Sequence, residues 1–258
     1  MARVNHKTYI NLILAFGLFL GLVFSFLLVV AQGSEVPNFA CGGYYPFSKG
    51  FQWRYIFKVN HTGRDEASYI LTVSNNSKGK LSGDPTLNQG ISLKDPENPG
   101  KDLGNYRRIL LFDENKVMEI TPGNRTDQSA VKTLLLCPPK EGKNWQTKDK
   151  IEFDFFEEKS LLEIQLDYRI KRSGHEISVR SGEYGKSIQV VASGGKTVEF
   201  NRSKFTVRFK ETSWYSPKVG LIKEKLVKKV LKGPSDSSNQ ELYRVEKELT
   251  LEEYGEKF

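Results

Sequence analysis

The sequence predicts an all-β protein: an antiparallel, hairpin-connected and strongly curved sheet, as a half-barrel or an open barrel or sandwich, preceded by one N-terminal transmembrane or signal helix. Apolar and polar residues alternate with period two along most of the chain. Clusters of Gly, Pro and Asn separate the alternating runs. One long uncharged segment stands near the N-terminus. We therefore divide the chain into a signal anchor or signal peptide at residues 1–34 and an extracytoplasmic β domain at residues 35–258.

The N-terminal segment carries no charge from Thr8 to Ser34. Its apolar run at 12–31 is long enough to cross ~30 Å of hydrocarbon as a helix, whereas a secretory apolar region has about 7 to 15 residues. The small residue Ala31 also suits a signal peptidase, so the sequence leaves open whether residues 9–31 stay in the membrane or are removed. Arg3 and Lys7 precede the run in both cases and are expected to remain cytoplasmic, which exports the rest of the chain.

Period-two alternation is most regular at residues 51–59 and 162–170, as a strand with one face on a core requires. Turn clusters between the alternating runs predict successive hairpins. Residues 81–104 have the weakest pattern and are expected to form a long loop with at most one short strand or helical turn. The shorter alternating runs lie at 69–73, 107–112, 116–121, 151–155, 176–179, 188–192, 205–209, 221–231 and 243–251, and the turn clusters at 75–79, 95–100, 122–124, 173–174, 193–195 and 232–235.

The charge of the chain limits the classes of partner that we expect, and its cysteine count indicates a disulfide. The formal net charge of +8 is dispersed and accompanied by no aromatic-basic platform or reading helix, so no nucleic-acid partner is expected. The Lys-rich run at 223–232 is interpreted as a charged strand that discourages aggregation, with contact to anionic lipid as the alternative. Export places Cys41 and Cys137 in an oxidising compartment, which favours a disulfide over two buried thiols.

A motif of Pro, Gly and aromatic residues occurs three times. Pro ends a hydrogen-bonded ladder, Gly allows a tight reversal, and the aromatic residue can be the first inward side chain of a strand. The structural turn residues predicted from this motif are Pro46, Gly50, Trp53, Pro139, Gly142, Trp145, Trp214, Tyr215, Pro217 and Gly220.

These motifs resemble a group of exported bacterial β-proteins of unknown function, which open with Y-x-P-x-x-x-G-x-x-W-x-Y and close with W-Y-x-P-x-V-G-L-I. The resemblance begins at Tyr44 and extends to about residue 231. It implies an extracytoplasmic antiparallel sheet, and it supplies no catalytic residues and no support for the disulfide.

The sequence predicts no catalytic, cofactor-binding or metal-binding residue, because nucleophile elbows, phosphate loops and metal-ligand spacings are missing from it. His61 and His175 border polar, turn-like sequence and are expected to lie in exposed loops. The acidic groups at 113–115 and 157–159 each fall between two alternating runs and are expected to form solvated hairpin turns.

The resulting prediction is a non-enzymatic extracytoplasmic β domain, membrane-anchored or secreted, that binds a partner protein, an envelope polymer or a lipid. One alternative is an envelope hydrolase that uses carboxylates at strand ends, with His175, Asp113 and Glu114 as candidates. Another is a lipid carrier, in which the aromatic residues on strands line an apolar half-barrel cavity. Several polar side chains converging with strongly shifted pKa values would argue against the non-enzymatic role.

Overall fold

The structure is a computed structural model that describes residues 41–98, 100–120, 131–155, 158–200, 202–233 and 240–256. All of these residues belong to one compact unit, Phe39–Phe258. The predicted leader at residues 1–34 lies outside the described residues. No helix in the described ranges is long and apolar enough to cross a membrane.

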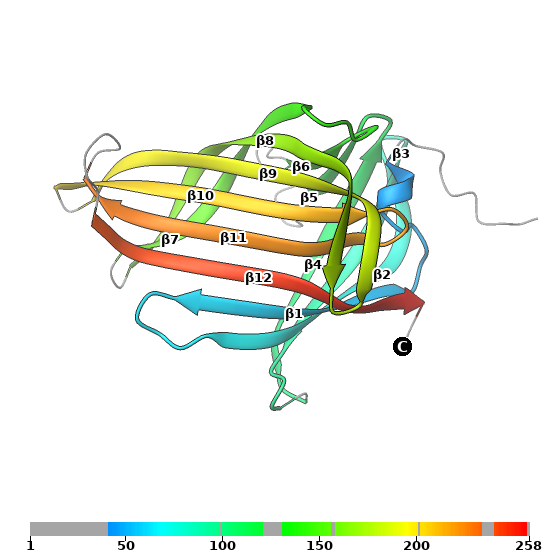
Figure 1. Ribbon diagram of the computed structural model, residues 1–258, viewed down its shortest axis with the longest axis horizontal. Helices are drawn as coiled ribbons and strands as arrows, with labels where there is room; N and C mark the ends of the chain where they lie inside the picture. Colours follow the sequence, from blue (N-terminus) through cyan, green and yellow to red (C-terminus); the bar gives the residue numbers. More distant parts are fainter. Residues whose placement is uncertain are drawn as a thin grey trace, which may run out of the picture. The chain divides into compact units, whose positions relative to one another are not determined.

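The described residues form twelve strands in one antiparallel sheet (Figure 1). A short 3-10 helix, η1 (Gly42–Tyr44), precedes them. The strands are β1 (Phe51–His61), β2 (Ala67–Leu81), β3 (Asp84–Lys94), β4 (Asp102–Asp113), β5 (Lys116–Ile120), β6 (Val131–Leu136), β7 (Asn144–Phe155), β8 (Glu158–Val179), β9 (Gly182–Phe200), β10 (Ser203–Ser216), β11 (Gly220–Lys232) and β12 (Gln240–Glu256).

The strand order places the first strand beside the last. It runs β6-β5-β4-β3-β2-β1-β12-β11-β10-β9-β8-β7, so the two edge strands come from the middle of the chain. These edges meet, because the Trp145 side chain on β7 donates a hydrogen bond to the carbonyl of Thr133 on β6, at 3.1 Å. The sheet is therefore nearly closed and barrel-like. The predicted all-β, antiparallel and strongly curved fold is confirmed.

Each alternating run of the sequence lies within one of these strands as far as the structure describes it, but the prediction for residues 81–104 was wrong. This region contains all of β3 and the start of β4. Its pattern is weak because β3 presents a buried polar residue, Gln89, at a position where an apolar inward residue would mark a strand. Strand β6 was also missed, and it is only 6 residues long.

Three predicted turns lie inside strands instead. Residues 75–79 belong to β2, 173–174 to β8 and 193–195 to β9. The pairing shifts register between Asn75 and Ser77 in β2, and at three places between Ile170 and Ile177 in β8. A β-bulge inserts an unpaired residue and interrupts the alternation, so its sequence looks like a turn.

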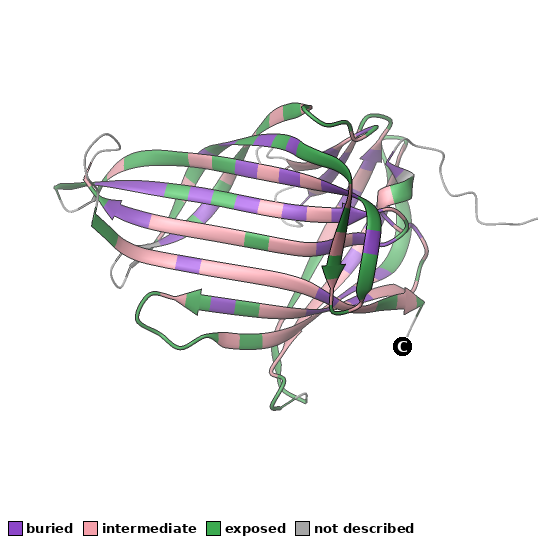
Figure 2. Cartoon of the chain, in the orientation of Figure 1, coloured by how far each residue is buried: buried purple, intermediate pink, exposed green. Residues whose placement is uncertain are grey.

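Two clusters of buried residues hold the sheet together (Figure 2). The larger cluster lies in the space that the curved sheet encloses. There, Tyr45 and Phe47, which precede β1, pack on Phe112 of β4. The smaller cluster contains Trp53 and Tyr184, and it joins β1 to the end of the β8–β9 hairpin. We call the side of the sheet that carries the larger cluster the inner face.

Candidate functional site

Charged side chains interrupt the apolar pattern of the inner face, and six of them influence one another's pKa values. Lys228 and Lys247 also face inward, over the rings of Phe153 and Phe57. The register of the strands places each of the six on the same face as a fully buried apolar neighbour, as with Asp149 opposite Ile164 and Glu119 opposite Leu110. We call these six residues the lumen cluster. They are Arg108 on β4, Glu119 on β5, Lys132 on β6, Asp149 on β7, Glu211 on β10 and Glu224 on β11.

The first half of the lumen cluster is a chain of hydrogen bonds across four neighbouring strands. The Arg108 guanidinium pairs with the Glu119 carboxylate at 3.0 Å and donates to the Gln89 side chain at 2.8 Å. Gln89 donates to the Asn75 amide oxygen at 2.8 Å, and Asn75 donates to the carbonyls of Pro46 and Ser48 at 2.9 Å each. This series of hydrogen bonds fixes residues 46–48, which precede β1, to the charged interior.

The second half centres on Lys132. Its ammonium lies 3.4 Å from a Glu211 carboxylate oxygen and 5.9 Å from the ring centroid of Tyr168. Ser213 donates to the other Glu211 oxygen at 3.3 Å. In the sheet, Tyr168 and Glu211 flank Ala192.

The pKa values of the carboxyl groups in the cluster reflect their burial and their mutual repulsion. Burial, and then the neighbouring Glu211 carboxylate, raises the pKa of Glu224 to about 7. Burial also raises the pKa of Asp149, although the nearby Lys132 ammonium opposes this. Removal from water disfavours the charged form of a carboxyl group, and a second carboxylate has the same effect. The folded protein therefore favours the protonated form of Glu224 more strongly than the unfolded chain does.

Two polar groups of this site have no protein partner. No hydrogen bond or ion pair joins Glu224 to any residue that the structure describes, and its side chain is only half-buried. Tyr168 is 2% exposed, and its hydroxyl has no hydrogen-bond partner among the residues that the structure describes. A buried polar atom without a partner costs free energy, so such an atom in a folded protein calls for water or a ligand.

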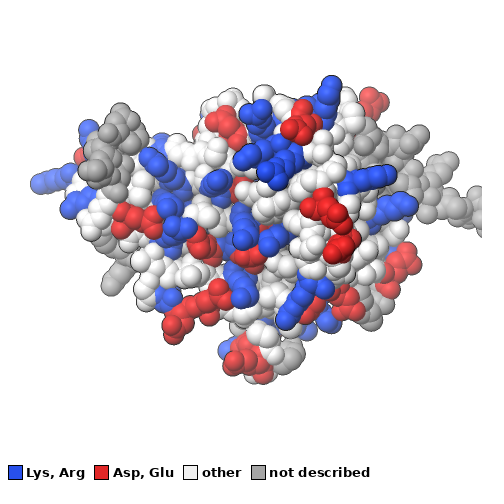
Figure 3. All heavy atoms as spheres, in the orientation of Figure 1, with Lys and Arg blue, Asp and Glu red and all other residues white. Residues whose placement is uncertain are grey.

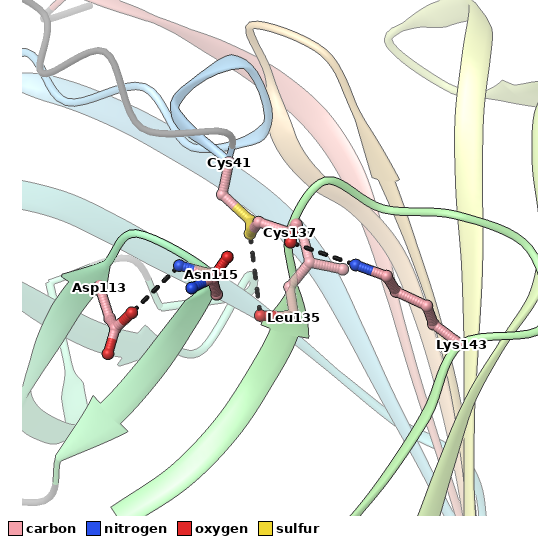
Figure 4. The surroundings of a disulfide bond; sticks show 6 residues. All are labelled: Cys41, Asp113, Asn115, Leu135, Cys137 and Lys143. Carbon is pink, nitrogen blue, oxygen red and sulfur yellow. Dashed lines mark hydrogen bonds between the residues drawn. A yellow bond between two sulfur atoms is a disulfide. The ribbon is translucent and has the colours of Figure 1, made fainter.

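The structure joins Cys41 and Cys137 in a disulfide, with their Cα atoms 5.3 Å apart (Figure 4). The backbone N–H of Cys137 donates to the carbonyl of Asn115 at 2.7 Å, in the β4–β5 turn. The Asp113 carboxylate accepts from the Asn115 N–H at 3.0 Å in the same turn. The disulfide therefore ties the residues that precede β1 to the end of β6 and the β4–β5 turn, and Asp113 stabilises that turn.

The predicted turn residues lie near the residues that precede β1, or at the beginning of strands. The Trp53 indole donates to the carbonyl of Val219, and Gly220 lies beside Tyr44 and Pro46, so the first and third motifs touch. Gly50, Gly142 and Gly220 have positive φ of 84°, 86° and 90°, where glycine is favoured. Pro139 lies between β6 and β7, Pro217 lies in the β10–β11 turn, and Trp214 and Tyr215 lie on β10.

The histidines and acidic groups considered in the sequence do not join the lumen cluster. His61 ends β1 and its Nδ1 lies 2.7 Å from the Tyr243 hydroxyl, while His175 lies within β8. Both are half-buried in strands, so the expectation of exposed loops was wrong; the bulges of β8 hide its continuation from the sequence pattern. Glu114 is exposed in the β4–β5 turn, as expected. Of residues 157–159, the structure describes the Lys159 side chain, which pairs with Glu152 at 2.9 Å.

The Lys-rich run of β11 is neutralised by acidic residues of β12. Lys223 and Lys225 both pair with Glu248, at 2.8 and 3.3 Å, and Lys229 pairs with Glu241 at 2.6 Å. Figure 3 shows basic and acidic side chains interspersed over the face formed by β9–β12. This surface has the mixed charge of a solvated sheet rather than the uniform charge that anionic lipid attracts.

Sequence reasoning missed the lumen cluster, although one signal was present. Glu211 occupies the same alternate position as Phe205, Val207, Phe209 and Tyr215, all of which are buried. A charged residue in register with an apolar series marks either an error in the predicted strand or a buried charge. At the other five positions a charged residue also interrupts an apolar series, but it indicates a buried charge only when the neighbouring strands are known.

No protein-family model matches the sequence, and no curated protein matches it. Two solved structures are similar in fold. One is a "putative exported protein with YmcC-like fold" from Bacteroides fragilis, with 10% identity, a TM-score of 0.44, and coverage of 82% of this chain and 98% of that chain. The other is a "putative lipoprotein" from Parabacteroides distasonis, with 11% identity, a TM-score of 0.43, and coverage of 82% and 97%.

Proposed function

We propose that this protein is an exported β domain, membrane-anchored or released, that binds a polar ligand of the cell envelope at the lumen cluster. Export is supported by the apolar segment at 12–31 and by the disulfide between Cys41 and Cys137, since disulfides persist in oxidising compartments. The observation that carries ligand binding is the pair of unpartnered polar groups, the Glu224 carboxyl and the Tyr168 hydroxyl.

The physical argument rests on what buried charges cost. Moving a charge out of water is unfavourable unless it is paired and hydrogen-bonded, and even a paired charge is often less stabilising than an apolar residue of the same size. Six charged side chains at inward positions therefore reduce the stability that the fold could reach. Groups retained at such a cost in the interior of a barrel-like sheet are typical of a binding site.

The lumen cluster favours a polar ligand over a lipid. An acyl chain beside Glu224 and Asp149 would remove water from two carboxyl groups and supply no hydrogen bond. A ligand with hydroxyl, amide or amine groups would satisfy both Glu224 and Tyr168. Among the partners expected from the sequence, a segment of an envelope polymer has this chemistry.

Hydrolysis is a second candidate function, and one observation favours it. General acid catalysis uses a carboxyl group whose pKa is raised by burial and by a neighbouring carboxylate, and Glu224 beside Glu211 is such a group. These carboxyl groups lie in the middle of β10 and β11 rather than at strand ends. Convergence of polar side chains with shifted pKa values argues for catalysis, and the following experiment separates hydrolysis from binding.

The test uses the full chain produced with its N-terminal segment in a bacterial host and purified in mild detergent. The protein is incubated with a soluble digest of envelope polysaccharide and analysed by native mass spectrometry. We expect the wild type to retain a polar fragment that Glu224→Leu loses, while Glu163→Gln, an exposed change on the outer face of β8, retains it. Retention of fatty-acyl species alone, or retention unaffected by Glu224→Leu, would contradict the proposal. Shortening of the digest by the wild type would support hydrolysis instead.

A further inference from the structure

We infer that the outer face of β7–β9 carries a second binding site, a basic hollow that takes an acidic sugar of an envelope polysaccharide. The hollow lies on the opposite face of the sheet from the lumen cluster, so it is separate from the site of the proposed function. Only the location of its ligand in the envelope rests on that proposal.

The hollow has a volume of ≈ 520 Å³ and opens to solvent, and we call it the outer hollow. Val191 is half-buried at its floor, whereas the side chains around it are exposed. The outer hollow therefore has an aliphatic floor and a polar rim. Its side chains come from two adjacent rows of the sheet, which are Asn144, Arg169 and Val191, and Gln146, Asp167 and Ser193.

The cations around the outer hollow have no acidic partner among the residues that the structure describes. Arg169 and Lys171 line it, and Arg208 and Lys210 lie on the same face two strands away, on β10. All four side chains are exposed, and no ion pair joins any of them to a described residue. Asp167 is the acid in the lining. The excess of positive charge gives this part of the surface a potential that attracts anions.

A second hollow on the outer face shows that this excess is local. It also has a volume of ≈ 520 Å³, and its cations are Lys58 and Arg180. Lys58 pairs with Glu66 at 2.8 Å, and Arg180 pairs with Glu252 at 3.5 Å. The charges of the second hollow are therefore compensated, unlike those of the outer hollow.

The side chains of the outer hollow match the groups of an acidic sugar. The Arg169 guanidinium is a planar donor that can hold a carboxylate through two parallel hydrogen bonds. The amides of Asn144 and Gln146 can donate to sugar hydroxyls, and the Asp167 carboxylate, which accepts from Gln146 Nε2 at 2.7 Å, can accept from one. The aliphatic side chain of Val191 offers an apolar surface to the C–H face of the ring.

The arrangement favours a single extended polymer over a membrane surface. Arg169 on β8 and Lys210 on β10 are two strands apart, about 10 Å at the usual strand spacing. A polymer with an acid on each sugar can contact both cations along its length. A flat anionic bilayer would instead meet the whole outer face, where Lys223, Lys225 and Lys229 of β11 are already paired with acids of β12.

The test compares oligosaccharides that differ in charge alone. The full chain in a neutral detergent is titrated by calorimetry with a hexamer of galacturonic acid, and with the methyl-esterified hexamer as the neutral match. We expect the acid to bind about tenfold more tightly or better, because it forms charged hydrogen bonds that the ester lacks. Its affinity should fall several-fold between about 50 and about 200 mM salt, since exposed charges are screened.

Four variants connect binding to the outer hollow. Arg169→Gln should weaken binding of the acid hexamer about tenfold, and Lys171→Gln about threefold. Arg169→Lys keeps the charge but not the planar fork, so its loss should lie between the wild type and Arg169→Gln. Lys58→Gln removes one positive charge from the second hollow and is the matched control, which should bind like the wild type. All three replaced side chains are exposed, so the fold should be retained.

Equal binding of the two hexamers, or equal weakening by Arg169→Gln and Lys58→Gln, would overturn the inference. Inorganic polyphosphate that binds as tightly as the acid hexamer would show attraction by charge alone and would contradict the sugar. Vesicles of phosphatidylglycerol and phosphatidylcholine that bind through Arg169, when the hexamer does not bind, would assign these cations to lipid instead.

Failure of this inference can be told from failure of the proposed function. Glu224→Leu should leave binding of the acid hexamer unchanged, because Glu224 lies on the inner face. In native mass spectrometry, an acidic fragment that Arg169→Gln loses and Glu224→Leu keeps belongs to the outer hollow. A fragment that only Glu224→Leu loses supports the proposed function, and loss of the acid hexamer in Glu224→Leu would place the acidic sugar at the lumen cluster and overturn the outer site.

Discussion

Replacing Glu224 by Gln is expected to stabilise the domain at neutral and alkaline pH. Burial and the Glu211 carboxylate raise the pKa of Glu224 from 4.5 to about 7. In the unfolded chain the carboxyl ionises near its ordinary pKa, whereas the folded protein keeps the proton up to about pH 7. Between these two values the folded state binds more protons than the unfolded state. The free energy of unfolding therefore falls as pH rises through this window.

The size of the effect follows from the two pKa values. Their difference corresponds to about 3 kcal/mol, at roughly 1.4 kcal/mol for each pKa unit. Because Glu224 is half-buried, this is an upper bound, and we expect a gain of about 1–3 kcal/mol for the Gln variant above pH 7. For a domain of this size, 1 kcal/mol changes Tm by about 2–4 °C. The variant should therefore melt roughly 2–12 °C above the wild type.

The assay is thermal unfolding followed by circular dichroism at about pH 5 and about pH 8. The wild type should lose stability between the two, and Glu224→Gln should lose less. Glu163→Gln is the control, because Glu163 is 48% exposed and pairs with Lys148 across 3.5 Å on the outer face. If the wild type and Glu224→Gln melt together at both pH values, the burial and repulsion assigned to Glu224 are wrong.

Three further changes test the surrounding fold. Reduction of the Cys41–Cys137 bond, which spans a sequence separation of 96, should lower the free energy of unfolding by about 2–5 kcal/mol in denaturant titrations; no change would mean that the bond is not formed. Gly194→Ala would place a Cβ against the backbone oxygen of its neighbouring strand, and should cost about 1–3 kcal/mol by thermal melting, whereas Gly185→Ala meets open space and should be tolerated. Asn75→Ala should lower the free energy of unfolding by about 1–3 kcal/mol and speed proteolysis of the residues that precede β1. Unchanged proteolysis would show that the hydrogen bonds from Asn75 do not hold these residues.

Much of the sheet could be predicted from the sequence because alternation is a local signal. Residues 162–170 lie in the interior of β8, and every second one from Leu162 to Ile170 faces inward. Prediction failed where the backbone interrupts that alternation. The bulge at Asn76 and those between Ile170 and Ile177 resemble turns, because Asn, Ser and Gly occur in both.

The sequence by itself predicted an all-β fold and a bond between its two cysteines, Cys41 and Cys137. Only the tertiary structure decided that β1 pairs with β12, that the edges β6 and β7 meet, and that six charged residues share one interior. The physical reason is separation along the chain. Arg108 and Glu224 influence each other only because the closed sheet brings distant strands around a common space, and no local pattern records which strands become neighbours.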